Sequence, residues 1–184
     1  MTGEANKRLT ADPDKELPFG PDVTLALEPN PMVSETLQQQ IEALEKRLQA
    51  RVKLRPEYRL LKTVPGIGET LATTIMLETG TVARFAQVGN FSSYCRCVDS
   101  RRESNGKKKG EGNTKNGNKY LAWAFVEAAN FALRHCPEAK RFYDRKKRST
   151  NGIVAIKALA HKFARACYHM LREQTPFDVR RCFV

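Results

Sequence analysis

The stretch YRLLKTVPGIGETLATTIMLET at residues 58–79 decides the expected fold. Its apolar residues recur at helical spacing on both sides of a Val-Pro-Gly-Ile-Gly segment at residues 64–68. Proline ends a helix and glycine permits a tight turn, so the stretch predicts a short helix, a turn and a second helix beginning near Glu69. No segment shows the alternation that is typical of a strand, and we therefore predict an all-α fold.

This helix, turn and helix resemble the helix-hairpin-helix motif of non-sequence-specific DNA-binding proteins. In such a turn, Gly66 and Gly68 let backbone N–H groups and the positive end of the second helix face a phosphate. The alternative is a helical corner without a ligand, because proline and glycine also suit a purely structural turn. The basic character of the chain favours the phosphate contact.

Outward from this stretch, the sequence divides into four segments. Residues 1–32 are rich in proline and acidic groups, which indicates an extended linker or arm. Residues 33–54 predict an amphipathic helix, residues 55–178 a compact helical domain, and residues 179–184 a tail. Within the domain, residues 120–132 are apolar most of the way round a helix, which predicts a central position, and residues 153–171 predict another helix.

The amphipathic helix, with Ser34 as its expected N-cap, carries a narrow apolar seam. Such a seam can pair with another helix as a short coiled coil, and packing on its own domain is the equal alternative. The seam consists of Leu37, Ile41, Leu44, Leu48 and Val52.

Residues 100–120, SRRESNGKKKGEGNTKNGNKY, form a basic segment rich in glycine and asparagine. Cations beside flexible glycines suit a phosphate ligand, although a cluster of lysines can also be only a solvated charge run. Asn116 and Asn118 lie where the central helix begins, so backbone donors and cations can converge there. The candidate cations are Arg101, Arg102, Lys107, Lys108, Lys109, Lys115 and Lys119.

Ser104 is the candidate nucleophile, because it lies among these cations beside Gly106. A serine placed there could attack a phosphodiester while the cations stabilise the developing charge. Ser100 is the fallback, and a turn-forming role is the alternative for either serine. No histidine lies nearby in the sequence to act as a general base.

The composition agrees with a nucleic-acid partner. The formal net charge is +12, and Arg141 and Arg145 add a basic face on an expected helix. Five cysteines without CxxC spacing and the lack of a signal segment indicate reduced thiols and a cytoplasmic protein, and no apolar run predicts a membrane contact. The sequence lacks a Walker A loop, a dinucleotide-binding fingerprint and a dense carboxylate set for metal.

Four segments together resemble the C-terminal domain of IS110/IS116/IS902-type transposases. They are LLKTVPGIGETLATTIMLETG, the F-x-x-x-x-N-F-x-x-Y-C pattern from Phe85, SNGKKKGEGNTKNGNKYLAWAFVEAANFA and NGIVAIKALAHKFARACYHML. They follow one another in the order and with the spacing of the family, and the resemblance covers about residues 33–178.

The resemblance implies an RNA-guided DNA recombinase whose nucleophile is Ser104, with Asn105 standing where glycine is more usual. It implies that Mg²⁺ binds a DEDD carboxylate set in an N-terminal RuvC-like domain, which this sequence lacks, and no cofactor within this chain. The implied partners are transposon-end and target DNA, guide RNA, and a second copy or a full-length transposase paired through residues 34–52. A nucleoid-associated location follows, and a non-catalytic binding or pairing module is the alternative function.

Overall fold

A computed structural model describes residues 29–98, 101–105, 107–111 and 116–183. The chain divides into two units, residues 1–51 and residues 52–184. In the first unit the described element is helix α3, Pro29–Val52, which continues to the first residue of the second unit. This helix begins four residues before the predicted start at residue 33, because proline needs no backbone N–H partner in the first turn of a helix.

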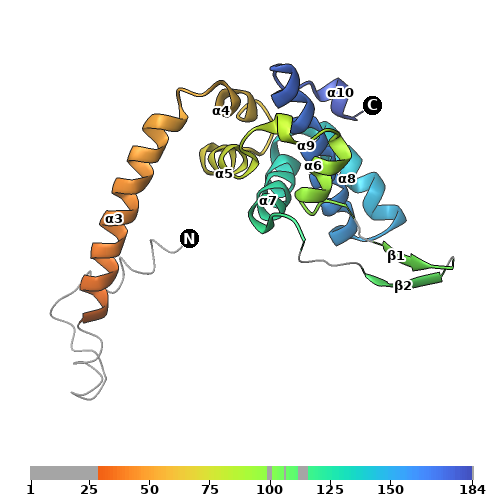
Figure 1. Cartoon of the computed structure of the whole chain (residues 1–184), viewed down its shortest axis with the longest axis horizontal. Coiled ribbons are helices and arrows are strands. Elements are labelled where there is room, and N and C mark those ends of the chain that lie inside the picture. Colours follow the sequence, from red (N-terminus) through yellow and green to blue (C-terminus); the bar gives the residue numbers. More distant parts are fainter. Residues whose placement is uncertain (1–28, 99–100, 106, 112–115, 184) are drawn as a thin grey trace, which may run out of the picture. The chain divides into compact units, whose positions relative to one another are not determined.

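The second unit is a helical domain, as the sequence predicts (Figure 1). The stretch at residues 58–79 forms the predicted pair of helices, α4 (Pro56–Leu61) and α5 (Glu69–Thr79). A short 3-10 helix η1 (Val82–Arg84) and helix α6 (Val88–Tyr94) follow. The remaining helices are α7 (Lys119–His135), α8 (Pro137–Ser149), α9 (Gly152–Glu173) and α10 (Val179–Phe183).

The basic segment departs from the all-α prediction. It contains two short antiparallel strands, β1 (Arg101–Ser104) and β2 (Lys107–Glu111). The two residues between the strands are Asn105 and Gly106, and Asn105 has a left-handed φ of 54°. Asn-Gly is the sequence that two-residue hairpin turns favour, and this signal overrides the weak alternation of the strands themselves.

Helices α7 and α9 form the centre of the domain. Each packs against the other and against α8, and the rings of Phe91, Phe125 and Phe163 are fully buried around them. The predicted tail is instead part of the domain, because α10 packs on α8 and α9 (Figure 1). Phe183 of α10 contacts Phe142 and Phe163 with ring centroids 6.1 and 6.2 Å apart.

The turn between α4 and α5 lies directly against α7. Gly66 has a φ of +86°, and a Cβ atom at this position would lie 2.2 Å from the carbonyl oxygen of Ala128. Gly66 is therefore required for the close approach of the turn to α7. Gly68 differs, since a Cβ atom there would meet nothing within 4 Å and its φ is an ordinary −85°.

None of the described helices is long and apolar enough to cross a membrane. All five cysteines are free thiols. Burial raises the pKa of Cys97 to about 12 and that of Cys182 to about 11. These thiols therefore stay protonated near neutral pH and behave as small apolar residues.

Candidate nucleic-acid interface

The candidate nucleophile Ser104 is the last residue of β1. Its backbone pairs with that of Lys107, so the serine lies directly before the hairpin turn. Asn105 and Lys107, on either side of Gly106, are exposed to solvent. Asparagine tolerates the left-handed conformation that Asn105 adopts.

Ser100 and Lys115 lie outside the described residues. For Arg101, Arg102, Ser104, Lys108 and Lys109 the structure describes the strands but not the side chains.

The two ends of the hairpin segment meet at the start of α7. The backbone N–H of Asn118 donates to the carbonyl oxygen of Tyr94 at 2.7 Å, and Arg96 donates to the carbonyl oxygen of Gly117 at 2.9 Å. Gly117 has a φ of +92°, and a Cβ atom there would lie 2.5 Å from the Tyr94 carbonyl oxygen. The chain thus leaves α6 and returns to α7 at one junction, which we call the hairpin base (Tyr94, Arg96, Gly117 and Asn118).

The Asn118 side chain is the most highly connected group of the hairpin base. Its Oδ1 accepts from the backbone N–H groups of Tyr120 and Leu121, at 2.8 and 3.0 Å, and so caps α7. Its Nδ2 donates to Glu78 of α5 at 2.5 Å and lies 3.5 Å from the Tyr94 hydroxyl. The hydrogen bond with Asn118, followed by one from Arg84, lowers the pKa of Tyr94 below its ordinary value. The side chain of Asn118 therefore links α5, α6 and α7. The sequence indicated only that this residue lies at the start of a helix.

The predicted helix-hairpin-helix residues occupy a different place. Gly66 contacts α7 near Ala128, ten residues beyond Asn118, and its need for glycine is explained by packing. Gly68 is exposed, and α5 begins there without a side-chain cap. Glu69 in the first turn of α5 pairs with Lys62 at 3.3 Å, so a carboxylate already faces the positive end of this helix.

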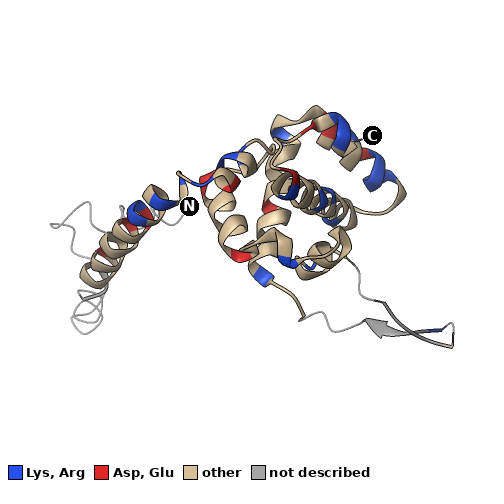
Figure 2. Ribbon diagram, turned by 45° about the horizontal axis from the view of Figure 1, so that its top comes forward, with Lys and Arg blue, Asp and Glu red and all other residues tan. Residues whose placement is uncertain are grey.

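The remaining predicted cations are distributed over separate helices (Figure 2). Lys119 begins α7, and its Nζ lies 5.0 Å from the centre of the Tyr120 ring. Arg141 and Arg145 belong to α8 and line a shallow hollow with Asp144, Arg148 and Ser149. Arg141 pairs with Glu138 at 2.9 Å, whereas the guanidinium of Arg145 lies 5.9 Å from the Phe142 ring. The structure therefore joins Asn116, Asn118 and Lys119 to the hairpin base and keeps Arg141 and Arg145 on another helix.

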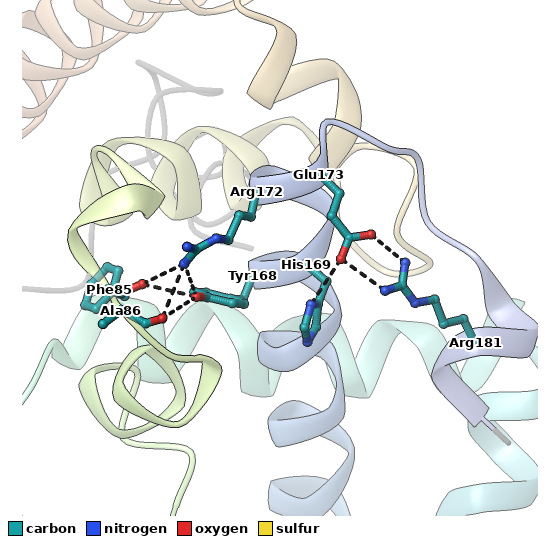
Figure 3. Close-up of polar contacts among 7 residues, drawn as sticks. All are labelled: Phe85, Ala86, Tyr168, His169, Arg172, Glu173 and Arg181. Carbon is teal, nitrogen blue, oxygen red and sulfur yellow. Dashed lines mark hydrogen bonds and ion pairs between the residues drawn. The ribbon is translucent and has the colours of Figure 1, made fainter.

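His169 of α9 lies in a group of polar contacts (Figure 3). His169 lies 3.3 Å from Glu173, which also accepts from Arg181 of α10 at 2.6 Å. The preceding residue, Tyr168, donates its hydroxyl proton to the carbonyl oxygen of Phe85 at 3.1 Å. Burial, with the nearby Arg165 and Lys162, lowers the pKa of His161. The contacts of Tyr168, His169 and Glu173 connect α9 with the segment at Phe85 and with α10.

The described residues offer no metal centre. Across residues 29–98, 101–105, 107–111 and 116–183, no group of three His, Cys, Asp or Glu side chains could hold a metal ion. The described residues therefore do not fit a Mg²⁺ site.

Two known proteins are similar to this chain over most of its length. The insertion element IS110 uncharacterized 43.6 kDa protein of Streptomyces coelicolor is 25% identical over 143 residues, which cover 77% of this chain and 35% of that protein. A probable family 20 transposase of Pseudomonas aeruginosa is 26% identical over 147 residues, which cover 77% of this chain and 43% of that protein. The chain thus matches less than half the length of either relative.

The sequence profile of the Transposase IS116/IS110/IS902 family matches residues 58–144. The match runs from α4 through the hairpin base to α8 and therefore contains the candidate site. Residues 58–144 therefore form a domain of the IS116/IS110/IS902 transposase family, and the chain is partial in length relative to its homologues.

Proposed function

We propose that this chain is the nucleic-acid-binding, serine-bearing part of a DNA transposase. The observation that carries the proposal is the hairpin base. Ser104 lies beside the turn of the hairpin, and hydrogen bonds join Tyr94 to Asn118 and Arg96 to Gly117, on the two sides of the segment that contains the hairpin. A basic hairpin with an anchored base can present a serine to a phosphodiester without losing its connection to the packed helices.

The proposed step is a phosphoryl transfer to serine. The Ser104 Oγ forms a bond to phosphorus, one bond from phosphorus to a deoxyribose oxygen breaks, and the hydroxyl proton ends on the released oxygen. Cations of the hairpin stabilise the charge that develops on the phosphate. A second transfer to another deoxyribose hydroxyl releases the serine and joins the new strand.

A metal-dependent step is not assigned to this chain, because its described residues do not form a metal site. We propose that the carboxylate residues come from a separate polypeptide region of the same family. The chain alone is then inactive in strand cleavage, and the activity requires both parts together. Target DNA and guide RNA bind the combined assembly.

The α8 surface supports the nucleic-acid part of the proposal. Arg145 and Arg148 are exposed cations beside Arg141 on a helix with two acidic residues, and phosphates are the ligands that such a face attracts. The exposed seam of α3 supports the pairing part. Leu37, Ile41 and Leu44 are 58, 48 and 68% exposed, and burial of such a seam against a second copy or a full-length transposase removes it from water.

The catalytic role predicts a covalent protein–DNA adduct. Nicked DNA carrying transposon ends, incubated with this chain and a separately expressed carboxylate domain of the family, should yield an adduct that denaturing gel electrophoresis detects. Ser104→Ala should abolish the adduct, because the attacking oxygen is gone, and Ser100→Ala should retain it. An adduct that survives Ser104→Ala and disappears in Ser100→Ala would transfer the role to Ser100. An adduct that persists in both variants would exclude both serines as the nucleophile, and the absence of an adduct with the unsubstituted chain would favour the non-catalytic module.

The α8 cations predict a change in the salt dependence of DNA binding. If Arg141 and Arg145 each neutralise one phosphate, the double substitution to glutamine should lower the slope of log affinity against log salt by about 2. Fluorescence anisotropy with labelled duplex DNA measures the slope. Lys46→Gln with Arg47→Gln on α3 is the charge-matched control and should leave the slope close to that of the unsubstituted chain. Equal slopes for all three proteins would remove α8 from the interface.

The α3 seam predicts self-association of the whole chain. Leu44→Lys should shift sedimentation toward the monomer, because it places a charge in the middle of the paired seam. Gln39→Lys carries the same new charge outside the seam and should leave the association unchanged. A chain that sediments as a monomer at tens of micromolar, with or without either substitution, would contradict pairing between copies.

A further inference from the structure

Helix α7 exposes three of its four large aromatic side chains and buries mainly small residues. Four of its six buried residues are alanines, Ala124, Ala128, Ala129 and Ala132, accompanied by Leu121 and Phe125. Tyr120, Trp123 and Phe131 remain 52, 47 and 43% exposed. Close packing explains the alanines, because the turn at Gly66 and the neighbouring helix α9 approach the backbone of α7. It does not explain three half-exposed rings on the other side.

The exposed rings lie along one face of the helix. Tyr120 and Trp123 are separated by three residues and are therefore neighbours on the helix surface. The same face continues through the half-buried Glu127 to Phe131 and Arg134, at further spacings of four, four and three. This exposed aromatic face (Tyr120, Trp123, Phe131) begins at the hairpin base, where Asn118 caps the helix.

A cation accompanies the ring at each end of the face. The Lys119 Nζ lies 5.0 Å from the centre of the Tyr120 ring, and the guanidinium of Arg134 lies 5.9 Å from the centre of the Phe131 ring. Aromatic rings interleaved with cations match a ligand that alternates flat rings with negative charges. A single nucleic-acid strand has that pattern, because each nucleotide adds one base and one phosphate.

The pattern favours an unpaired strand over a duplex or a protein. In a duplex the faces of the bases are stacked on one another and cannot reach an aromatic side chain. A protein partner prefers a continuous apolar patch, whereas Glu127 and Asn130 interrupt this face and cations flank it. The sequence that precedes α7 is also rich in basic residues.

We infer that the exposed aromatic face of α7 is a stacking platform for unpaired bases of single-stranded nucleic acid. The inference rests on the proposed nucleic-acid function and adds the form of ligand that this surface selects. Tyr120 and Trp123 stack on successive bases, and Lys119 contacts the intervening phosphate. A strand held there lies beside the hairpin base. Stacking of this kind tolerates any base sequence.

The only tryptophan of the chain makes the inference directly measurable. Titration of the full chain with a single-stranded oligothymidine should quench the emission of Trp123, whereas a duplex of equal length should leave that emission nearly unchanged. Labelled oligonucleotides should then report the affinities of variants by anisotropy. Tyr120→Ala and Trp123→Ala should each weaken single-strand binding by about tenfold and change duplex binding by less than about twofold.

Two further variants separate stacking from general damage. Trp123→Phe keeps an aromatic ring and should retain most of the single-strand affinity. Ile153→Ala removes a side chain that is 73% exposed on α9, outside the aromatic face, and should bind like the unsubstituted chain. Circular dichroism melting should show that all four variants keep the fold, since their side chains are at least partly exposed.

The other outcomes overturn the inference in distinguishable ways. Single-strand affinity unchanged in Tyr120→Ala and Trp123→Ala excludes the stacking platform. Loss of self-association in these variants, with unchanged single-strand affinity, assigns the face to a protein partner instead. Duplex binding that persists while single strands neither bind nor quench rejects stacking and leaves the proposed function standing. Absence of binding to both forms rejects the two proposals together.

Discussion

The side chain of Asn118 is the constraint on which the candidate site depends. One amide caps α7 through Tyr120 and Leu121, reaches Glu78 on α5, and lies beside the Tyr94 hydroxyl. A hydrogen-bonded helix cap contributes about 1 kcal/mol, but here the same residue also closes the ends of the hairpin segment through its backbone. The segment that contains the basic hairpin therefore leaves the folded domain and returns to it at one point, the hairpin base. The proposed binding and the proposed chemistry at Ser104 both rely on that connection.

Helix α7 serves the domain with one face and the proposed ligand with the other. Its alanines let the Gly66 turn and α9 approach closely, so the inner face gains stability from packing at short distance. Its rings gain little from folding, because about half of each stays in water. The packed face fixes where the helix lies. The outer face begins at the hairpin base, where Asn118 caps the helix.

The sequence was sufficient for the helices because their apolar spacing and their punctuation by proline agree, as in α5 and α9. It missed the hairpin, because basic strands without alternation give no periodic signal and only Asn105-Gly106 marks the turn. The residues of α7 are apolar most of the way round the helix, which predicted a central position. This pattern does not specify which of the aromatic rings a neighbouring element covers. The contact between Gly66 and Ala128 joins residues 62 positions apart, which a single sequence does not specify. Asn118 was a candidate through its place at a helix start, and its link to Glu78 required the fold.

The most direct test of the anchored hairpin base compares two asparagine caps in the same protein. Asn118→Ala and Asn151→Ala each remove a side-chain cap, from α7 and α9, and each should lower stability by about 1 kcal/mol. Only Asn118 also anchors the hairpin, so DNA affinity measured by anisotropy under fully folded conditions should fall several-fold in Asn118→Ala and stay unchanged in Asn151→Ala, because a freed hairpin must be ordered on binding. Equal DNA affinity in the two variants would contradict the account, since Asn118 would then be a helix cap and nothing more.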